Sequence, residues 1–174
     1  MQRKAVRSIT AAQKKEFIRI LQELLRQEQI LEMRKFIQHG NTTTLAHCFV
    51  VAYYSYRLAL LLPMRFHYKS LIRGAMLHDF YLYDWHIPDP SHRLHGFVHP
   101  RFALNNARQY FILEPMEEDI ILKHMWPLTL HAVPRYRESL IVCIVDKLCS
   151  FAETLYLPML PNNMLPGFLR TQDF

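Results

Sequence analysis

Glycine is scarce in this chain of 174 residues, and the four that occur are far apart: Gly40, Gly74, Gly96 and Gly167. A Walker P-loop, a GxGxxG dinucleotide fingerprint and a GxSxG nucleophile elbow each need clustered glycines, because the backbone there approaches a ligand closely or turns sharply. The sequence therefore excludes these three common motifs of nucleotide-binding proteins and hydrolases.

Cysteine is also scarce, and its three residues form no CxxC pair: Cys48, Cys143 and Cys149. This odd number argues against a disulfide framework and against a structural zinc finger. No apolar run follows the basic N-terminus, so we find no secretory signal. The most apolar stretch, residues 45–62, contains Arg57, which costs about 2.5–3.5 kcal/mol near the centre of a bilayer. We therefore predict a buried core helix there, no membrane span and a cytoplasmic location.

The positive charge is concentrated at one end of the chain. The formal net charge is +6, and residues 1–35 hold nine Lys or Arg and four Glu, which leaves about +1 for the rest. A protein that binds a nucleic acid polymer would spread its basic residues differently, so we predict no such partner. A solvated helix face explains the basic segment most simply. An arm that contacts phosphates or a membrane surface is the alternative.

Apolar residues recur with helical spacing, and no run alternates as a strand would. The residue His99 stands before Pro100, and because proline suits the first helical position, we expect a helix to open there with His99 at or near its N-cap. Residues 81–96, with Pro88 and Pro90, are expected to form a loop. Other helices are predicted over residues 10–37, 44–62, 67–80, 117–126 and 136–156.

These elements predict an all-α fold, a compact helical bundle that forms one domain over residues 1–174. Its parts are expected to be a basic amphipathic helix over residues 1–40, a helical core over residues 42–156 and an irregular tail over residues 157–174. The core is the part that contains most of the histidines.

Polar residues interrupt the apolar faces of five segments in this core. They are His47, His78, Asp79, His99, His124 and Asp146. Any one alone is more simply a core histidine or a capped acid that has hydrogen-bond partners. Six together point to a different chemistry, because imidazole and carboxylate groups suit Zn, Fe, Mn or Mg better than a dry core.

The order of His47, His78-Asp79 and Asp146 resembles the H…HD…D signature of the HD-domain metal-dependent phosphohydrolase superfamily. The surrounding segments TTTLAHCFVVAYYSYRLA, GAMLHDFYLYDW and IVDKLCSFAET are similar to that family too. The segments HGFVHPRFALNNA and ILKHMWPLT resemble those that supply extra histidines in its two-metal branches. The resemblance covers about residues 42–154 and implies an HD-domain-like helical bundle with metal at its centre.

Carried over residue by residue, the resemblance implies that His47, His78, Asp79 and Asp146 hold a first divalent ion. Asp79 would bridge to a second ion held by His99 and His124. The cofactor would be one or two ions of Zn, Fe, Mn or Mg, with His78 and Asp79 as the catalytic dipeptide. The implied reaction is hydrolysis of a small phosphate ester, with a nucleotide as the expected substrate, by attack of metal-bound hydroxide on phosphorus.

The substrate stays open, because Leu82 stands where some branches have Lys or Glu, and no GYP-like motif follows the last histidine. Candidate phosphate partners are Arg101, Lys123 and Lys147, with solvated surface positions as the alternative, since neighbouring helical residues point about 100° apart. Asp84 is a candidate general acid or ligand of a substrate hydroxyl, and a turn cap is the alternative.

Three further residues have two interpretations each. His95 is a candidate third ligand of the second ion or a proton donor, and Tyr83 and Trp126 are candidates to stack on a base or to lie in the core. Two other functions compete with phosphohydrolysis: a di-iron oxygenase that uses the same ligands, and a non-catalytic module that senses a nucleotide. An oligomer is possible for each of them.

Overall fold

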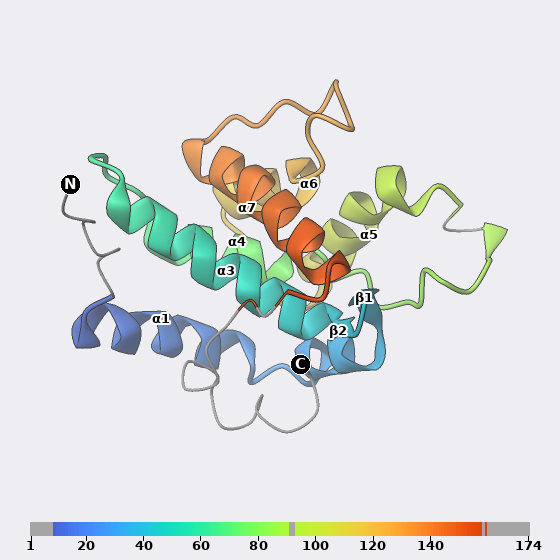
Figure 1. Ribbon diagram of the computed structural model, residues 1–174, viewed down its shortest axis with the longest axis horizontal. Coiled ribbons are helices and arrows are strands. Elements are labelled where there is room, and N and C mark those ends of the chain that lie inside the picture. Colours follow the sequence, from blue (N-terminus) through green and yellow to red (C-terminus); the bar gives the residue numbers. More distant parts are fainter. Residues whose placement is uncertain (1–8, 91–92, 158, 160–174) are drawn as a thin grey trace.

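The computed structural model describes residues 9–90, 93–157 and 159 of the chain (Figure 1). These residues are mostly helical, which confirms the predicted all-α character, and their only strands form one short hairpin. The helices are α1 (Ala11–Leu24), α2 (Glu28–Glu32), the 3-10 turn η1 (Met33–Lys35), α3 (Thr44–Leu61), α4 (Tyr68–Leu77), α5 (His95–Tyr110), α6 (Pro115–Lys123) and α7 (Arg137–Thr154). Most of the predicted tail, and the basic residues at positions 3, 4 and 7, lie outside the described residues.

The first predicted helix, over residues 10–37, is wrong in its length. Thr10 caps α1 by accepting from the backbone N–H of Gln13 (3.2 Å), but α1 ends at Leu24 and the chain turns into α2 and η1. A continuous helix would be about 42 Å long and would carry Ile30 and Met33 past the core. The turn instead buries both side chains completely.

A hairpin follows η1, although the sequence predicts no strand. Its strands β1 (Ile37–His39) and β2 (Thr42–Thr43) pair antiparallel, with His39 opposite Thr42. Gly40 lies in the turn with a φ of 56°, a left-handed conformation that glycine adopts at little cost. Strands this short show no alternation that a sequence pattern can reveal.

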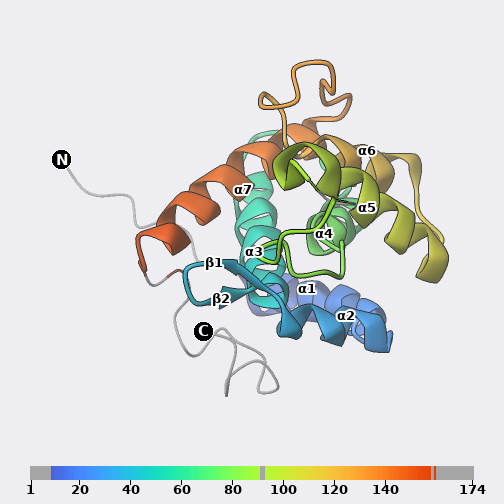
Figure 2. The ribbon, with the colours of Figure 1, turned by 90° about the vertical axis from the view of Figure 1, so that its right-hand side faces the viewer.

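Helix α3 is buried on nearly every side and lies between α4 and α7 (Figure 2). The hydroxyl of Thr43 accepts from Ala46 N and caps its start (3.2 Å). Helix α1 contributes the ring of Phe17, whose centroid lies 5.8 Å from that of Phe49 on α3. Most side chains of α3 are buried, so it is a core helix as predicted. None of the described helices is both long enough and apolar enough to cross a membrane.

Helix α5 begins at His95, five residues before Pro100, the predicted first helical residue. Leu94 has a left-handed backbone conformation (φ 62°), and the helix runs from His95 through Pro100. His99 is therefore not an N-cap but lies inside the helix. Pro100 stands inside α5, where it removes the hydrogen bond to the carbonyl four residues earlier and its ring crowds that carbonyl. The extra turn places His95 directly below His99 on the same side of α5.

Candidate metal centre

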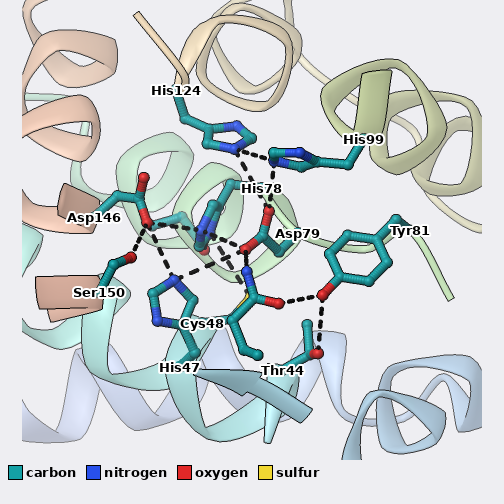
Figure 3. A network of polar contacts seen from close by, with 12 residues as sticks. Thr44, His47, Cys48, His78, Asp79, Tyr81, His99, His124, Asp146 and Ser150 are labelled. Carbon is teal, nitrogen blue, oxygen red and sulfur yellow. Dashed lines mark hydrogen bonds and ion pairs between the residues drawn. The ribbon is translucent and has the colours of Figure 1, made fainter. Parts of the chain in front are cut away.

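The six predicted ligand residues lie together in the interior of the helical bundle (Figure 3). His47 comes from α3, His99 from α5 and Asp146 from α7. The other three stand where helices end: His78 and Asp79 follow α4, and His124 follows α6. All six side chains are buried. Residues up to 99 positions apart in the chain thus meet at one point.

The first group of ligand atoms surrounds one oxygen of Asp79 and one of Asp146. His47 Nε2 lies 3.1 Å from Asp146 Oδ1 and 3.8 Å from Asp79 Oδ2. His78 Nε2 lies 3.3 Å from Asp79 Oδ2 and 3.6 Å from Asp146 Oδ1. Two imidazoles and two carboxylates therefore direct their ligand atoms at the same small volume.

The second group uses the other oxygen of Asp79. His99 Nε2 lies 3.1 Å from Asp79 Oδ1, and His124 Nε2 lies 3.5 Å from it. The two imidazole Nε2 atoms are 2.8 Å apart. Because its two oxygens face different groups, Asp79 joins them, and the described residues contain three overlapping sets of ligand atoms close enough to hold a metal ion.

Backbone carbonyls fix three of the histidine rings. His78 Nδ1 bonds to Ala75 O (2.7 Å), His99 Nδ1 to His95 O (2.8 Å) and His124 Nδ1 to Ile121 O (2.8 Å). A carbonyl only accepts, so each Nδ1 carries the proton, and in the neutral ring the Nε2 lone pair points into the centre. Two such lone pairs repel each other at the His99–His124 distance unless a proton or a cation lies between them.

Two buried atoms of the centre have no hydrogen-bond partner: His78 Nε2 and Asp79 Oδ1. Buried polar atoms are rarely left in this state, because losing water without a replacement is costly. Ligand atoms that lie about 2.0–2.2 Å from one ion are about 3–3.6 Å from each other in tetrahedral or octahedral geometry. Most distances in the two groups match this range. The residues therefore lie close enough, and have the right chemistry, to hold a metal ion.

The two carboxylates of the centre have lowered pKa values, whereas the pKa of His47 is raised and that of His124 is lowered. Burial raises the pKa of Asp79 and Asp146, but the neighbouring imidazoles hold both pKa values well below the usual range. Burial disfavours protonation of His47, yet Asp146 and Glu153 raise its pKa to about 10. Burial, with nearby His78, lowers the pKa of His124 to about 3. His47 keeps its proton because its ring bonds to two carboxylates. At His124, burial and the charge of His78 outweigh the nearby Asp79.

Sequence reasoning missed three residues that hold the ligands in place. Glu153 Oε2 lies 2.7 Å from His47 Nδ1, which forms the carboxylate–histidine pair common behind metal ligands. Gln38 Nε2 donates to Asp79 Oδ2 (2.5 Å), and the hydroxyl of Tyr81 donates to Gln38 Oε1. Glu153 stands seven residues after Asp146, on the same side of α7, and that spacing was a usable signal.

A pocket of about 880 Å³ opens onto the centre. Its floor contains four of the six candidate ligands: Asp79, His99, His124 and Asp146. Its walls are largely apolar and include Trp85, Ile87, Pro88, Leu94, Phe97 and Met125. His47 and His78 lie behind this floor. A molecule in the pocket would therefore reach the second group of ligand atoms directly.

The structure brings only one of the four candidate substrate-binding residues to the pocket. Lys147 lines it, and its Nζ donates to His124 O (2.8 Å). Lys123 pairs with Asp119 (2.6 Å), and Arg101 is exposed; neither lines the pocket. Asp84 also lies outside the lining, and its Oδ1 accepts from the backbone N–H of His86 (3.0 Å), which is the turn-capping alternative.

His95 lies in the pocket wall as part of a stack of rings. Its centroid is 4.5 Å from that of His99 and 5.2 Å from that of Trp85, with nearly parallel planes. The hydroxyl of Tyr83 lies 2.9 Å from His95 Nδ1. Trp126, the other stacking candidate, is not among the lining residues, whereas Trp85 and the cation Arg93 are. Sequence analysis missed Trp85 and Arg93 because the loop that contains them has no periodic pattern.

Comparisons with known proteins find no relative of this chain: no family model, no curated protein and no solved structure matches it. The resemblance to HD-domain proteins therefore stays a prediction from the sequence. A function has to be inferred from the geometry of the centre and the pocket above it.

Proposed function

We propose that this protein is an HD-type, metal-dependent hydrolase of small phosphate esters. The observation that carries the proposal is the pair of ligand groups joined by Asp79 at the floor of a pocket. Two ligand sets that share a carboxylate are typical of two-metal hydrolytic sites. The pocket volume of about 880 Å³ lies in the range that accommodates a molecule of nucleotide size.

The chain itself would contribute preorganised ligands. Divalent ions, when bound, would supply Lewis-acid charge at the phosphate and lower the pKa of water toward neutrality. Asp79 would offer one oxygen to each group, while the carbonyl-bound rings of His99 and His124 need no reorientation. Lys147, held at the rim by His124 O, would add positive charge where a phosphate oxygen enters.

The walls favour a phosphate ester with an apolar or ring-shaped organic part. Trp85 has its ring in the wall, and its buried Nε1 has no hydrogen-bond partner, so it can donate to a substrate acceptor. Arg93 is the lining residue besides Lys147 that carries a permanent positive charge. A nucleotide, with its base against the wall and its phosphate on the floor, satisfies these features.

A phosphoester screen on Asp79→Asn and wild type tests this function. The wild type, purified with its metal, should release phosphate or alcohol from at least one ester. Asp79→Asn should lose at least about 10²-fold in rate, because removing the shared carboxylate weakens both ligand groups. Glu118→Gln is the matched control, since Glu118 pairs with Arg108 at the surface. Folded wild-type protein with bound metal and no hydrolysis of any ester would contradict the proposal.

The apolar walls favour one second candidate, a di-iron oxygenase that uses the same ligands. Oxygen chemistry needs a pocket that excludes water, and the walls here contain few charged groups. Iron content with a colour or paramagnetic signal that changes in oxygen would support this candidate. Tight nucleotide binding without turnover would instead support the sensing module.

A further inference from the structure

The outer side of α7 is apolar, although it faces away from the core. Five large apolar side chains occupy its exposed positions: Leu140, Ile144, Leu148, Phe151 and Leu155. Their spacings of three and four residues place them on one face of the helix, which we call the α7 outer face. Leu148 and Phe151 are 63% and 66% exposed. Surface helices of globular proteins normally present polar residues on this side.

The segments that flank α7 in the sequence also hold exposed apolar residues. Leu128, Leu130 and Val133 are exposed in the loop between α6 and α7. The described residues after α7 add two more exposed apolar side chains, Tyr156 and Leu157. An exposed apolar patch such as the α7 outer face marks an interaction site more often than apolar residues exposed singly.

This surface carries positive charge and no exposed acid. The three acids of residues 125–157 are Glu138, Asp146 and Glu153, and all are buried. Glu138 accepts from the backbone N–H of His67 (2.9 Å), and the other two belong to the metal centre. Arg135 and Arg137 are exposed, whereas the Lys147 ammonium turns to His124 O at the pocket. A partner should therefore be both apolar and anionic.

A second copy of the chain does not meet this requirement. The same surface of a second copy presents Arg135 and Arg137, and the acids of residues 125–157 are buried, so it lacks the negative charge. Parallel pairing also aligns Arg137 with Arg137. Like charges at an interface cost affinity.

We propose that the α7 outer face and the α6–α7 loop bind the surface of a lipid bilayer that contains anionic phospholipids. The leucine, isoleucine and phenylalanine side chains would enter the boundary between headgroups and acyl chains, as the apolar face of an interfacial helix does. Arg135 and Arg137 would pair with the anionic headgroups, each contributing about fivefold in affinity. This binding does not depend on the metal centre or on hydrolysis.

Vesicle co-sedimentation of the full chain tests the proposal, with phosphatidylcholine vesicles that either contain or lack phosphatidylserine. We expect binding to the anionic vesicles that weakens as salt rises. The double variant L148E/F151E should lose at least about tenfold in affinity, since two carboxylates would have to enter the interface. Arg137→Glu should lose at least about fivefold.

Ile112→Glu is the matched control, because Ile112 is 95% exposed in the connection between α5 and α6, away from this surface. It should bind as the wild type does, and circular dichroism should show equal folding of all variants. Equal binding to neutral and anionic vesicles, or no binding, would overturn the proposal. So would an equal loss in Ile112→Glu, or a wild-type dimer by light scattering that L148E/F151E dissociates.

Discussion

The hydrogen bond that each histidine makes through Nδ1 decides that its Nε2 atom is directed at the centre. The rings of His78, His99 and His124 each use Nδ1 on a backbone carbonyl, so Nε2 is the atom that faces the centre. His47 uses Nδ1 on the carboxylate of Glu153 instead. A carboxylate partner raises the basicity of a ligating imidazole more than a carbonyl does.

Glu153→Gln should therefore weaken metal binding by about 10–100-fold and leave the fold intact. The amide of glutamine can still accept the Nδ1 hydrogen bond, but it supplies no negative charge. Competition with a metal-sensitive dye measures the affinity directly.

Glu138→Gln is the control for this variant, because Glu138 is a buried acid on the same helix that contacts His67 N and not the centre. It should bind metal as the wild type does. Equal affinities in Glu153→Gln and wild type would show that the contact with His47 does not tune the ligand.

The six candidate ligands could be found in the sequence because five of them place a polar group on an apolar face and His99 precedes Pro100. Glu153 offered only its spacing from Asp146, and an acid near the end of a helix is ordinarily exposed. Gln38 and Tyr81 depend on the hairpin, which brings Gln38 to Asp79 across 41 positions of sequence. Such long-range contacts leave no local pattern.

At the scale of helices, the ends of α4 and α6 position two of the candidate ligands. The ends of α4 and α6 bring His78 and His124 to the same depth, with ring centroids 4.8 Å apart. Gly74 on α4 makes this approach possible, because a Cβ there would lie 2.7 Å from Ile120 Cδ1 on α6.

Gly74→Ala should destabilise the protein by about 1–3 kcal/mol through overpacking, despite the higher helix propensity of alanine. Gly96→Ala is its matched control on α5, where the nearest atom to a new Cβ is 3.5 Å away. It should be neutral or stabilising by up to about 1 kcal/mol. Denaturant unfolding of both variants measures the difference, and equal stability of the two would contradict close α4–α6 packing.

Asp119 joins α6 to the start of α7. Its Oδ2 accepts from Arg135 N (2.9 Å) and Ser139 Oγ (2.7 Å), and its Oδ1 pairs with Lys123. Burial raises the pKa of Asp119, but these three contacts outweigh burial and lower it below the usual value. The carboxylate therefore stabilises the fold above the unfolded-state pKa of about 3.9, and this contribution is lost as the pH falls through the lower folded pKa.

Asp119→Asn should cost about 1–3 kcal/mol at pH 7, since buried donors lose a charged acceptor. The difference in the free energy of unfolding between wild type and variant should shrink below about pH 4. Urea unfolding across this pH range provides the measurement. A difference that stays constant as the pH falls would show that the carboxylate is not ionised in the fold.

Element boundaries were predictable where a cap or a proline gives a local signal, as at Thr43 before α3 and at the predicted start of α7. They were wrong where tertiary contacts decide. The first helix breaks after Leu24 because burial of Ile30 and Met33 outweighs continued helix. Helix α5 starts early because Leu94 adopts a left-handed conformation that no sequence rule favours.

At the scale of the whole molecule, folding of the helical bundle brings the candidate ligands of five segments together at one centre. An ion bound by these segments would stabilise only the folded chain, by about 2.7 kcal/mol when the free ion is at 100 times its dissociation constant. The all-α architecture was predictable from periodicity alone. The pocket walls and the apolar α7 outer face were not, because both depend on which side of each element the neighbouring helices leave uncovered.

Metal stoichiometry tests the central claim most directly. Wild-type protein and Asp79→Asn would be purified without chelators and without a histidine tag, then analysed by mass spectrometry for bound metals. We expect about one to two divalent ions per wild-type chain and a marked loss in Asp79→Asn. Folded wild-type protein that contains no metal, and takes up none when Zn, Fe, Mn or Mg is added, would contradict the account.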